Sequence, residues 1–155
     1  MKKIHFDEFI ATGFYVGYLP IMPGTWASWV ACAIPLFLYE LFPDEYRLLL
    51  SVFVVLFFFL GIFSADAIAI VSRRSDPGFI VIDEWVGQWI PFLFVLPNPT
   101  AILIGFIFFR IFDITKIPPI AKLENLGGGL GIMLDDVMAG FYAGIALYFT
   151  SLFIR

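Results

Sequence analysis

Apolar residues run almost without interruption through most of the chain, and polar residues gather at the ends of these runs. The longest run, LLLSVFVVLFFFLGIF, is long enough to cross the hydrocarbon core of a bilayer as a helix. Strands are not expected, because apolar residues follow one another instead of alternating with polar ones. The pattern predicts an all-α integral membrane protein, a compact bundle of about five transmembrane helices at residues 26–42, 48–71, 79–97, 100–114 and 137–154.

The N-terminal stretch MKKIHFDEFIATG carries charges early and lacks the continuous apolar segment of a signal peptide. We therefore expect it to form a short helix that lies on the membrane surface. Of the 155 residues, 61% are hydrophobic and only 14% are charged, whereas soluble domains carry about 25% charged residues. This composition predicts a single membrane domain over residues 1–155.

Lysine and arginine are distributed unequally between the two sides of the predicted bundle. Short loops rich in these residues stay in the cytoplasm. With a cytoplasmic N-terminus, that side receives Lys2, Lys3, Arg73, Arg74, Lys116 and Lys122, with Arg110 near the same boundary. The opposite side keeps Arg47 and Arg155. The bias predicts a cytoplasmic N-terminus and an external C-terminus.

Carboxylates from distant parts of the sequence are expected at this cytoplasmic boundary: Asp83, Glu84, Asp113, Asp135 and Asp136. A carboxylate inside a bilayer costs about 2.5–3.5 kcal/mol on insertion scales, so these groups should face the bundle interior and have partners. Arg110 and Lys116 bring only two positive charges, which leaves negative charge uncompensated. A divalent cation would offset it, and oxygen ligands favour Mg²⁺ or Mn²⁺ over zinc.

Most of these groups also have a purely structural interpretation. Arg110, Asp113 and Lys116 share one helical stripe and could only link helices, although two cations beside a carboxylate also suit a metal with a phosphate. Asp135 or Asp136 could cap the last helix. The pair Asp83-Glu84 resists such an explanation best, because it lies inside a predicted span and not at its end.

Two further segments could bind an anion. The glycines at 127, 128, 129 and 131 could form a flexible connector, or their amides, those of Gly129 and Gly131 among them, could approach a phosphate. Thr25 and Ser28 follow Pro23-Gly24 at the expected start of a helix, where they are natural caps and where an anion would also be stabilised. Asp66 lies within the second span and is left without a role.

Several functions are disfavoured by composition. The net charge of −4 and the lack of a basic patch argue against nucleic-acid binding. A single cysteine, Cys32, excludes an internal disulfide. His5, the only histidine, cannot serve as both nucleophile and acid of a histidine phosphatase. The alternative from another class is a divalent-cation transporter or channel. Against it, the charges gather at one face and there is no internal repeat.

Four motifs together resemble the phosphatidylglycerophosphatase A family: PGTWAS (23–28), IDEWVGQWI (82–90), FRIFDITKIPPI (109–120) and GGGLGIMLDDVMAG (127–140). They stand in the family's order, and the resemblance as a whole covers the chain from about residue 8 to its end. The resemblance implies a multi-pass enzyme of the bacterial inner membrane. Such an enzyme uses Mg²⁺ to remove the terminal phosphate of phosphatidylglycerol phosphate, and its substrate and active site lie on the cytoplasmic side.

The family pattern carries over to Thr25, Ser28, Asp83, Glu84, Gly87, Arg110, Asp113, Lys116, Asp135 and Asp136. Our hypothesis is that the five carboxylates provide the Mg²⁺ ligands and a general base. Arg110 and Lys116 would bind the phosphoryl oxygens, with help from Thr25 and the glycine amides. We favour attack by water over a mechanism with an aspartyl-phosphate intermediate. The sequence itself does not decide between the two mechanisms. It also leaves the oligomeric state open.

Overall fold

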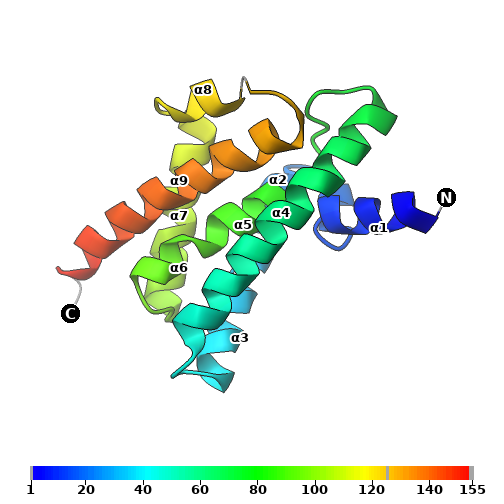
Figure 1. The fold of residues 1–155 in the computed structure, drawn as a ribbon. Coiled ribbons are helices and arrows are strands. Elements are labelled where there is room, and N and C mark those ends of the chain that lie inside the picture. The colour runs from blue at the N-terminus through cyan, green and yellow to red at the C-terminus, as the bar shows by residue number, and fades with distance from the viewer. Residues whose placement is uncertain (1, 125, 154–155) are drawn as a thin grey trace.

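The computed structural model describes residues 2–124 and 126–153, and within them all regular structure is helical (Figure 1). Arg155, assigned above to the external side, lies outside the described residues, as does residue 154. The helices are α1 (Lys2–Ala11), the 3-10 helix η1 (Val16–Tyr18), α2 (Pro23–Ala31), α3 (Ala33–Leu41), α4 (Tyr46–Ser72), α5 (Ile82–Trp89), α6 (Pro91–Phe94), α7 (Pro99–Thr115), α8 (Ile120–Glu124) and α9 (Gly128–Ser151).

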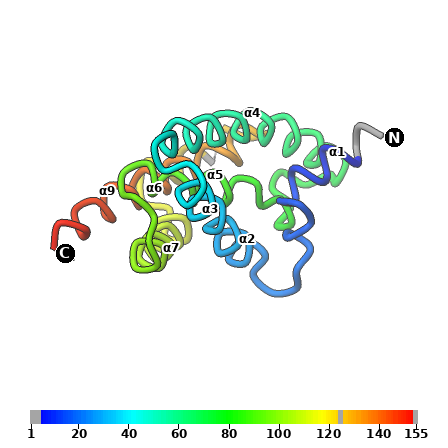
Figure 2. Tube along the Cα trace, turned by 90° about the horizontal axis from the view of Figure 1, so that it is seen from below, coloured from blue at the N-terminus to red at the C-terminus, as the bar shows by residue number. Residues whose placement is uncertain are grey.

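The short helix α5 lies at the centre of the molecule. It contacts α2, α4, α7 and α9, and Figure 2 shows it between α4 on one side and α7 on the other. The indole of Trp89 at its C-terminal end is almost completely buried, as are Phe92 on α6 and Leu50 on α4. Because α5 is enclosed on several sides, any polar residue that it carries must find its partners inside the protein.

Two of the described helices, α4 and α9, are long and apolar enough to cross a membrane. In α4 only 22% of the most apolar window is buried within the protein, and large side chains such as Phe63 and Ile70 are exposed. Such a surface is suited to lipid, since a soluble protein rarely exposes a contiguous apolar area of this kind. The helix expected over residues 48–71 is therefore confirmed, whereas the bundle of five transmembrane helices is not.

The first expected span, residues 26–42, is divided into α2 and α3 at Cys32. Pro35 explains the division, because proline has no N–H to donate to the carbonyl of Ala31. That carbonyl instead accepts a hydrogen bond of 3.0 Å from the indole N–H of Trp89. The interruption thus fastens the end of α2 to the end of α5.

The third expected span, residues 79–97, is also interrupted. It consists of α5 and the single turn α6, with Pro91 as the first residue of the second piece. The following helix α7 begins at Pro99, where the side chain of Asn98 accepts a hydrogen bond of 2.9 Å from the amide of Ala101. This capping confirms the break expected at 98–100, although α7, with 17 residues, is not among the helices long enough to span.

The last helix begins at Gly128 and not at residue 137 as expected. The supposed glycine loop is therefore the first turn of α9, and Asp135 and Asp136 lie well inside the helix. Capping of the helix by either aspartate is excluded by this position. A flexible connector, one of the two interpretations of these glycines, is not what the structure shows. Glycine disfavours helices, but close packing against α4 stabilises the helical turn here.

The connections between helices gather at two ends of the molecule. Figure 1 shows the α4–α5 connection, α8 and the start of α9 at one end, with the α3–α4 connection and the end of α9 at the other. The first end contains Arg73, Arg74 and Lys122, and the second contains Arg47. This grouping matches the unequal charge distribution on which the orientation was predicted.

Candidate active site

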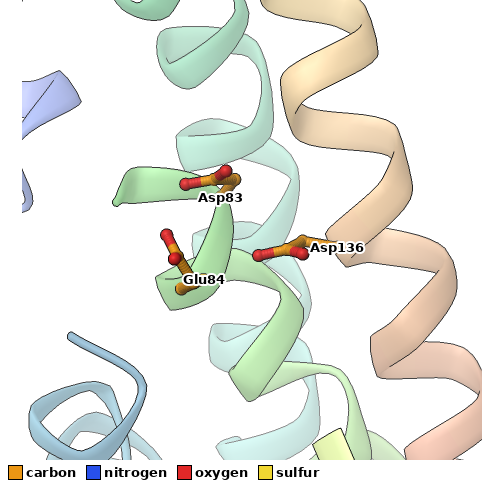
Figure 3. A group of neighbouring side chains, drawn as sticks. All are labelled: Asp83, Glu84 and Asp136. Carbon is orange, nitrogen blue, oxygen red and sulfur yellow. The ribbon is translucent and has the colours of Figure 1, made fainter. Parts of the chain in front are cut away.

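Three carboxylates from two helices meet beside the buried helix α5, and we call them the acidic group: Asp83, Glu84 and Asp136. One oxygen of each lies within 4.8 Å of the others. Figure 3 shows Asp136 reaching from α9 towards the first turn of α5, which carries Asp83 and Glu84. The N-terminal end of a helix favours negative charge, so the position of this pair is electrostatically supported by α5 itself.

Glycines bring the two helices close enough for this meeting. A side-chain carbon at Gly87 would lie 2.6 Å from the carbonyl oxygen of Asp136, and one at Gly140 would overlap the carbonyl of Gly87. The backbones of α5 and α9 are thus in direct contact at two points. Either glycine replaced by a larger residue would push the helices apart and separate the carboxylates.

The acidic group has unused hydrogen-bonding capacity. Asp83 Oδ1 and Glu84 Oε2 are inaccessible to solvent and have no hydrogen-bond partner in the described structure. Asp136 is only 3% exposed. Buried polar atoms without partners are rare and costly, and they point to a missing ion, water or ligand.

A paired arginine and aspartate adjoin the acidic group. Arg110 Nη1 lies 2.6 Å from Asp113 Oδ2 and donates a 3.4 Å hydrogen bond to the hydroxyl of Ser28. Asp113 is within electrostatic range of Glu84 and Asp136. The Nε of Arg110 is buried and has no partner in the described structure, so the guanidinium retains a donor for a further acceptor.

A second ion pair holds the neighbour of Asp136. Lys116 Nζ lies 3.1 Å from Asp135 Oδ2, and the other oxygen of Asp135 accepts a 3.0 Å hydrogen bond from the amide of Asp136. Asp135 is 6% exposed. Arg110 and Asp113 thus share one face of α7, as their spacing predicted, whereas Lys116 follows the end of this helix and reaches Asp135 from there.

The first motif reaches the same place from α2. The α-carbon of Gly24 packs against the carboxylate of Glu84, where a side chain would overlap it, and Thr25 Oγ1 is buried without a partner in the described structure. Ser28 donates to the carbonyl of Gly24 at 2.7 Å and accepts from Arg110. Neither hydroxyl caps the helix, because α2 begins at Pro23 with Met22 at the cap position.

The two glycines expected to bind phosphate have other partners. The amide of Gly129 donates to Asp66 Oδ1 at 3.3 Å, and that of Gly131 donates to the carbonyl of Gly127 at 3.2 Å. A side chain at Gly129 would overlap the backbone of Ile62. In this structure both glycines serve the start and close packing of α9, and a contact of their amides with an anion would require these bonds to open.

Two residues at the site were not anticipated. Asp66 caps the N-terminus of α9 from the neighbouring helix α4, and the sequence holds no local signal for such a contact. Gln88 is fully buried, and both atoms of its amide are without a partner in the described structure. It lies one helical turn after Glu84 on the same face of α5. A glutamine within an apolar run was the available signal for Gln88.

The residues of the acidic group fit a small, hard cation. Oxygens bound to one octahedral Mg²⁺ at about 2.1 Å stand about 3.0–4.2 Å apart, and the three oxygens are within 4.8 Å of one another. The donors are all carboxylates, which suit Mg²⁺ and Mn²⁺ better than softer metals. Asp83 Oδ1 and Glu84 Oε2, which have no hydrogen-bond partner among the described residues, are available as ligands for such an ion.

The fold and the site define an all-α protein with two helices of membrane-spanning character and a carboxylate centre flanked by an arginine and a lysine. The sequence profile described as Phosphatidylglycerophosphatase A matches residues 9–151. The chain belongs to the phosphatidylglycerophosphatase A family, in agreement with the resemblance of the four motifs. No solved structure matches the chain.

Individual relatives cover nearly the whole chain. A protein of Bacteroides thetaiotaomicron, provisionally named phosphatidylinositol-3-phosphatase, is 42% identical over 95% of both chains. Proteins named Phosphatidylglycerophosphatase A from Escherichia coli and Haemophilus influenzae are each 37% identical over 90% of this chain, and they are covered to 80% and 85%. All three names describe phosphatases of phospholipids.

Proposed function

We propose that the protein is a Mg²⁺-dependent lipid phosphatase that hydrolyses phosphatidylglycerol phosphate to phosphatidylglycerol and inorganic phosphate at the cytoplasmic face of a bacterial inner membrane. The observation that carries this proposal is the acidic group. Among the described residues, one buried oxygen each of Asp83 and Glu84 has no hydrogen-bond partner, and neither has the buried Nε of Arg110. Family membership supports the reaction class, since the relatives are named as lipid phosphatases.

The substrate is proposed from the names of the relatives. Two are named for phosphatidylglycerophosphate and one for a phosphoinositide. Both kinds of lipid carry a phosphate monoester on a hydroxylated headgroup. We favour phosphatidylglycerol phosphate because the family profile covers most of the chain, and we treat the phosphoinositide as the competing substrate in the experiment below.

Asp83, Glu84 and Asp136 would hold the Mg²⁺. When bound, the ion stabilises negative charge on the phosphoryl oxygens. Arg110 contributes directional donors: one of its nitrogens is held by Asp113 and Ser28, and its buried Nε is free to donate to a phosphoryl oxygen. The hydroxyl of Thr25, which has no hydrogen-bond partner among the residues that the structure describes, is a further donor on this side.

The reaction is an attack of water on phosphorus. The new bond joins the water oxygen to phosphorus, and the bond from phosphorus to the headgroup oxygen breaks. A carboxylate outside the acidic group, Asp113 or Asp135, accepts the proton of the attacking water. Each is held in place by a cation, Asp113 by Arg110 and Asp135 by Lys116. The departing alkoxide takes up a proton from solvent and leaves as the free alcohol, and the carboxylate returns its proton to solvent.

The position of the site suits a phosphate at the membrane surface. The acidic group lies at the beginning of α5 and in the first half of α9, and both helices begin towards the end of the molecule that holds Arg73, Arg74 and Lys122 (Figure 1). The positive-inside rule assigns that end to the cytoplasm. A headgroup phosphate could therefore enter while the acyl chains remain beside the exposed apolar surface of α4.

The decisive experiment is phosphate release by the detergent-purified protein. Phosphatidylglycerol phosphate, a phosphatidylinositol 3-phosphate and phosphatidic acid are supplied in matched micelles, with Mg²⁺ and then with a chelator. We expect Mg²⁺-dependent release that is fastest for phosphatidylglycerol phosphate and falls at least about 100-fold in Asp136→Asn. Asp44→Asn, on an exposed loop at the far end of α4, is the matched control.

Two results would contradict the proposal. Folded protein that releases no phosphate from any of these lipids with Mg²⁺ or Mn²⁺ would exclude a lipid phosphatase. Divalent-cation flux in liposomes containing that protein would then favour the transporter. Equal turnover by Asp136→Asn and the wild type would show that the acidic group does not take part in the reaction.

A further inference from the structure

A small cavity adjoins the acidic group on the side of the α4–α5 connection. It has a volume of about 90 Å³ and is lined by Ser75 and Asp76 of that connection, by Asp83, and by Asp135. Since one water occupies about 30 Å³ of liquid, the cavity has room for about three water-sized groups. None of the four motifs includes Ser75 or Asp76, so the sequence did not assign them a role.

The cavity and the acidic group share Asp83. The residue lines the cavity, belongs to the three converging carboxylates, and has a buried oxygen without a partner in the described structure. A molecule bound in the cavity would therefore lie directly beside a phosphate held at the acidic group. Asp76 also lines the cavity, and it is exposed.

The lining decides which chemistry the cavity suits. Three aspartates repel a second phosphate, which excludes an anion. Among the described residues the only carboxylates that converge closely enough for a metal are Asp83, Glu84 and Asp136, so Asp76 does not complete a second metal site. Carboxylates spread around a small cavity are good acceptors for hydroxyl groups, and Ile132 offers an apolar wall for carbon atoms.

We propose that this cavity binds the free hydroxyl of the substrate headgroup, on the carbon next to the one that bears the phosphate, with Asp76 as the specificity-determining acceptor. This inference rests on the proposed function. Phosphatidylglycerol phosphate and a phosphatidylinositol 3-phosphate both carry such a neighbouring hydroxyl, whereas phosphatidic acid does not. The cavity thus recognises the shared polyol character of the headgroup and not the phosphate.

The test removes the hydroxyl and its acceptor separately and together. The probe is phosphatidyl-1,3-propanediol phosphate, which differs from phosphatidylglycerol phosphate only by the missing hydroxyl. We expect kcat/KM of the wild type to be about tenfold lower on this analogue. On phosphatidylglycerol phosphate, kcat/KM of Asp76→Ala should be about tenfold lower than that of the wild type. On the analogue the substitution should cause no further loss, because the substitution and the missing hydroxyl remove the same contact. Asp44→Ala, an exposed aspartate remote from the cavity, should keep the wild-type ratio.

The outcomes separate this inference from the proposed function. A wild type that hydrolyses both lipids equally well, or losses in Asp76→Ala that add to the loss on the analogue, would overturn the hydroxyl site while leaving the phosphatase intact. A wild type that hydrolyses neither lipid would overturn the proposed function and the hydroxyl site with it. Ser75→Ala provides a second variant, in which a smaller loss of the same non-additive kind is expected.

Discussion

The site contains two kinds of carboxylate that differ in how their charge is compensated. Asp113 and Asp135 each contact a cation, at 2.6 Å and 3.1 Å. Asp83, Glu84 and Asp136 lie together, and two of them have buried oxygens without a hydrogen-bond partner in the described structure. The charge of the first kind is compensated within the protein, whereas compensation of the second kind requires a ligand.

This difference separates carboxylates that are held in place by a cation of the protein from carboxylates that are available to bind a ligand. Paired carboxylates have fixed orientations, because each shares its charge with one neighbour. Unpaired carboxylates that face one another destabilise the fold unless a cation joins them. A protein that keeps such a group retains it for function at the expense of stability. Changes to the two kinds of residue should therefore have opposite effects on folding.

The largest effect is expected for Asp83→Asn. Turnover should fall at least about 100-fold, because a charged ligand of the acidic group is lost. Without Mg²⁺, however, the variant should be more stable than the wild type by about 1–2 kcal/mol, since one like charge is removed. Thermal unfolding in detergent, followed by tryptophan fluorescence with and without Mg²⁺, measures this difference. A variant less stable than the wild type in chelator would contradict the comparison.

An intermediate effect is expected for Lys116→Met. Asp135 would keep its charge without this cation, so turnover should fall about tenfold and stability by about 1 kcal/mol, a modest value because Lys116 is partly exposed. The double variant Lys116→Met/Asp135→Asn should regain most of the stability but not the turnover. Strictly additive losses in this cycle would show that the pair is not coupled.

The smallest effect is expected for Asp66→Ala. Loss of the acceptor for the amide of Gly129 should cost about 0.5–2 kcal/mol, as for other helix caps, and turnover should change less than about threefold. Asp66→Asn retains an acceptor oxygen and should restore much of the stability. Hydrogen exchange of the amides in the first turn of α9 reports the loss directly. Unchanged exchange in Asp66→Ala would show that the contact with Gly129 is not formed in solution.

The sequence predicted which charged residues lie together better than it predicted the course of the chain. Charged residues spaced along one apolar helix had to share a face, and the cost of burying carboxylates required them to converge. By contrast, Pro35 and Pro91 divide expected spans into short helices. The apolar runs did not reveal these breaks, because an apolar run indicates burial and does not indicate whether a helix is continuous. The helical start at Gly128 depends on packing against Ile62 and on Asp66, contacts between distant segments that no local pattern contains.

The direct backbone contact between α5 and α9 has a consequence for the choice of ion. Where Gly87 and Gly140 touch the opposite backbone, no side chain can rotate to change the separation of the two helices. The opening between the carboxylates is thus set by the main chain and resists widening. Calcium requires longer bonds and more ligands than magnesium. We therefore expect calcium to bind more weakly than magnesium and not to support turnover, so that the protein selects its ion by radius.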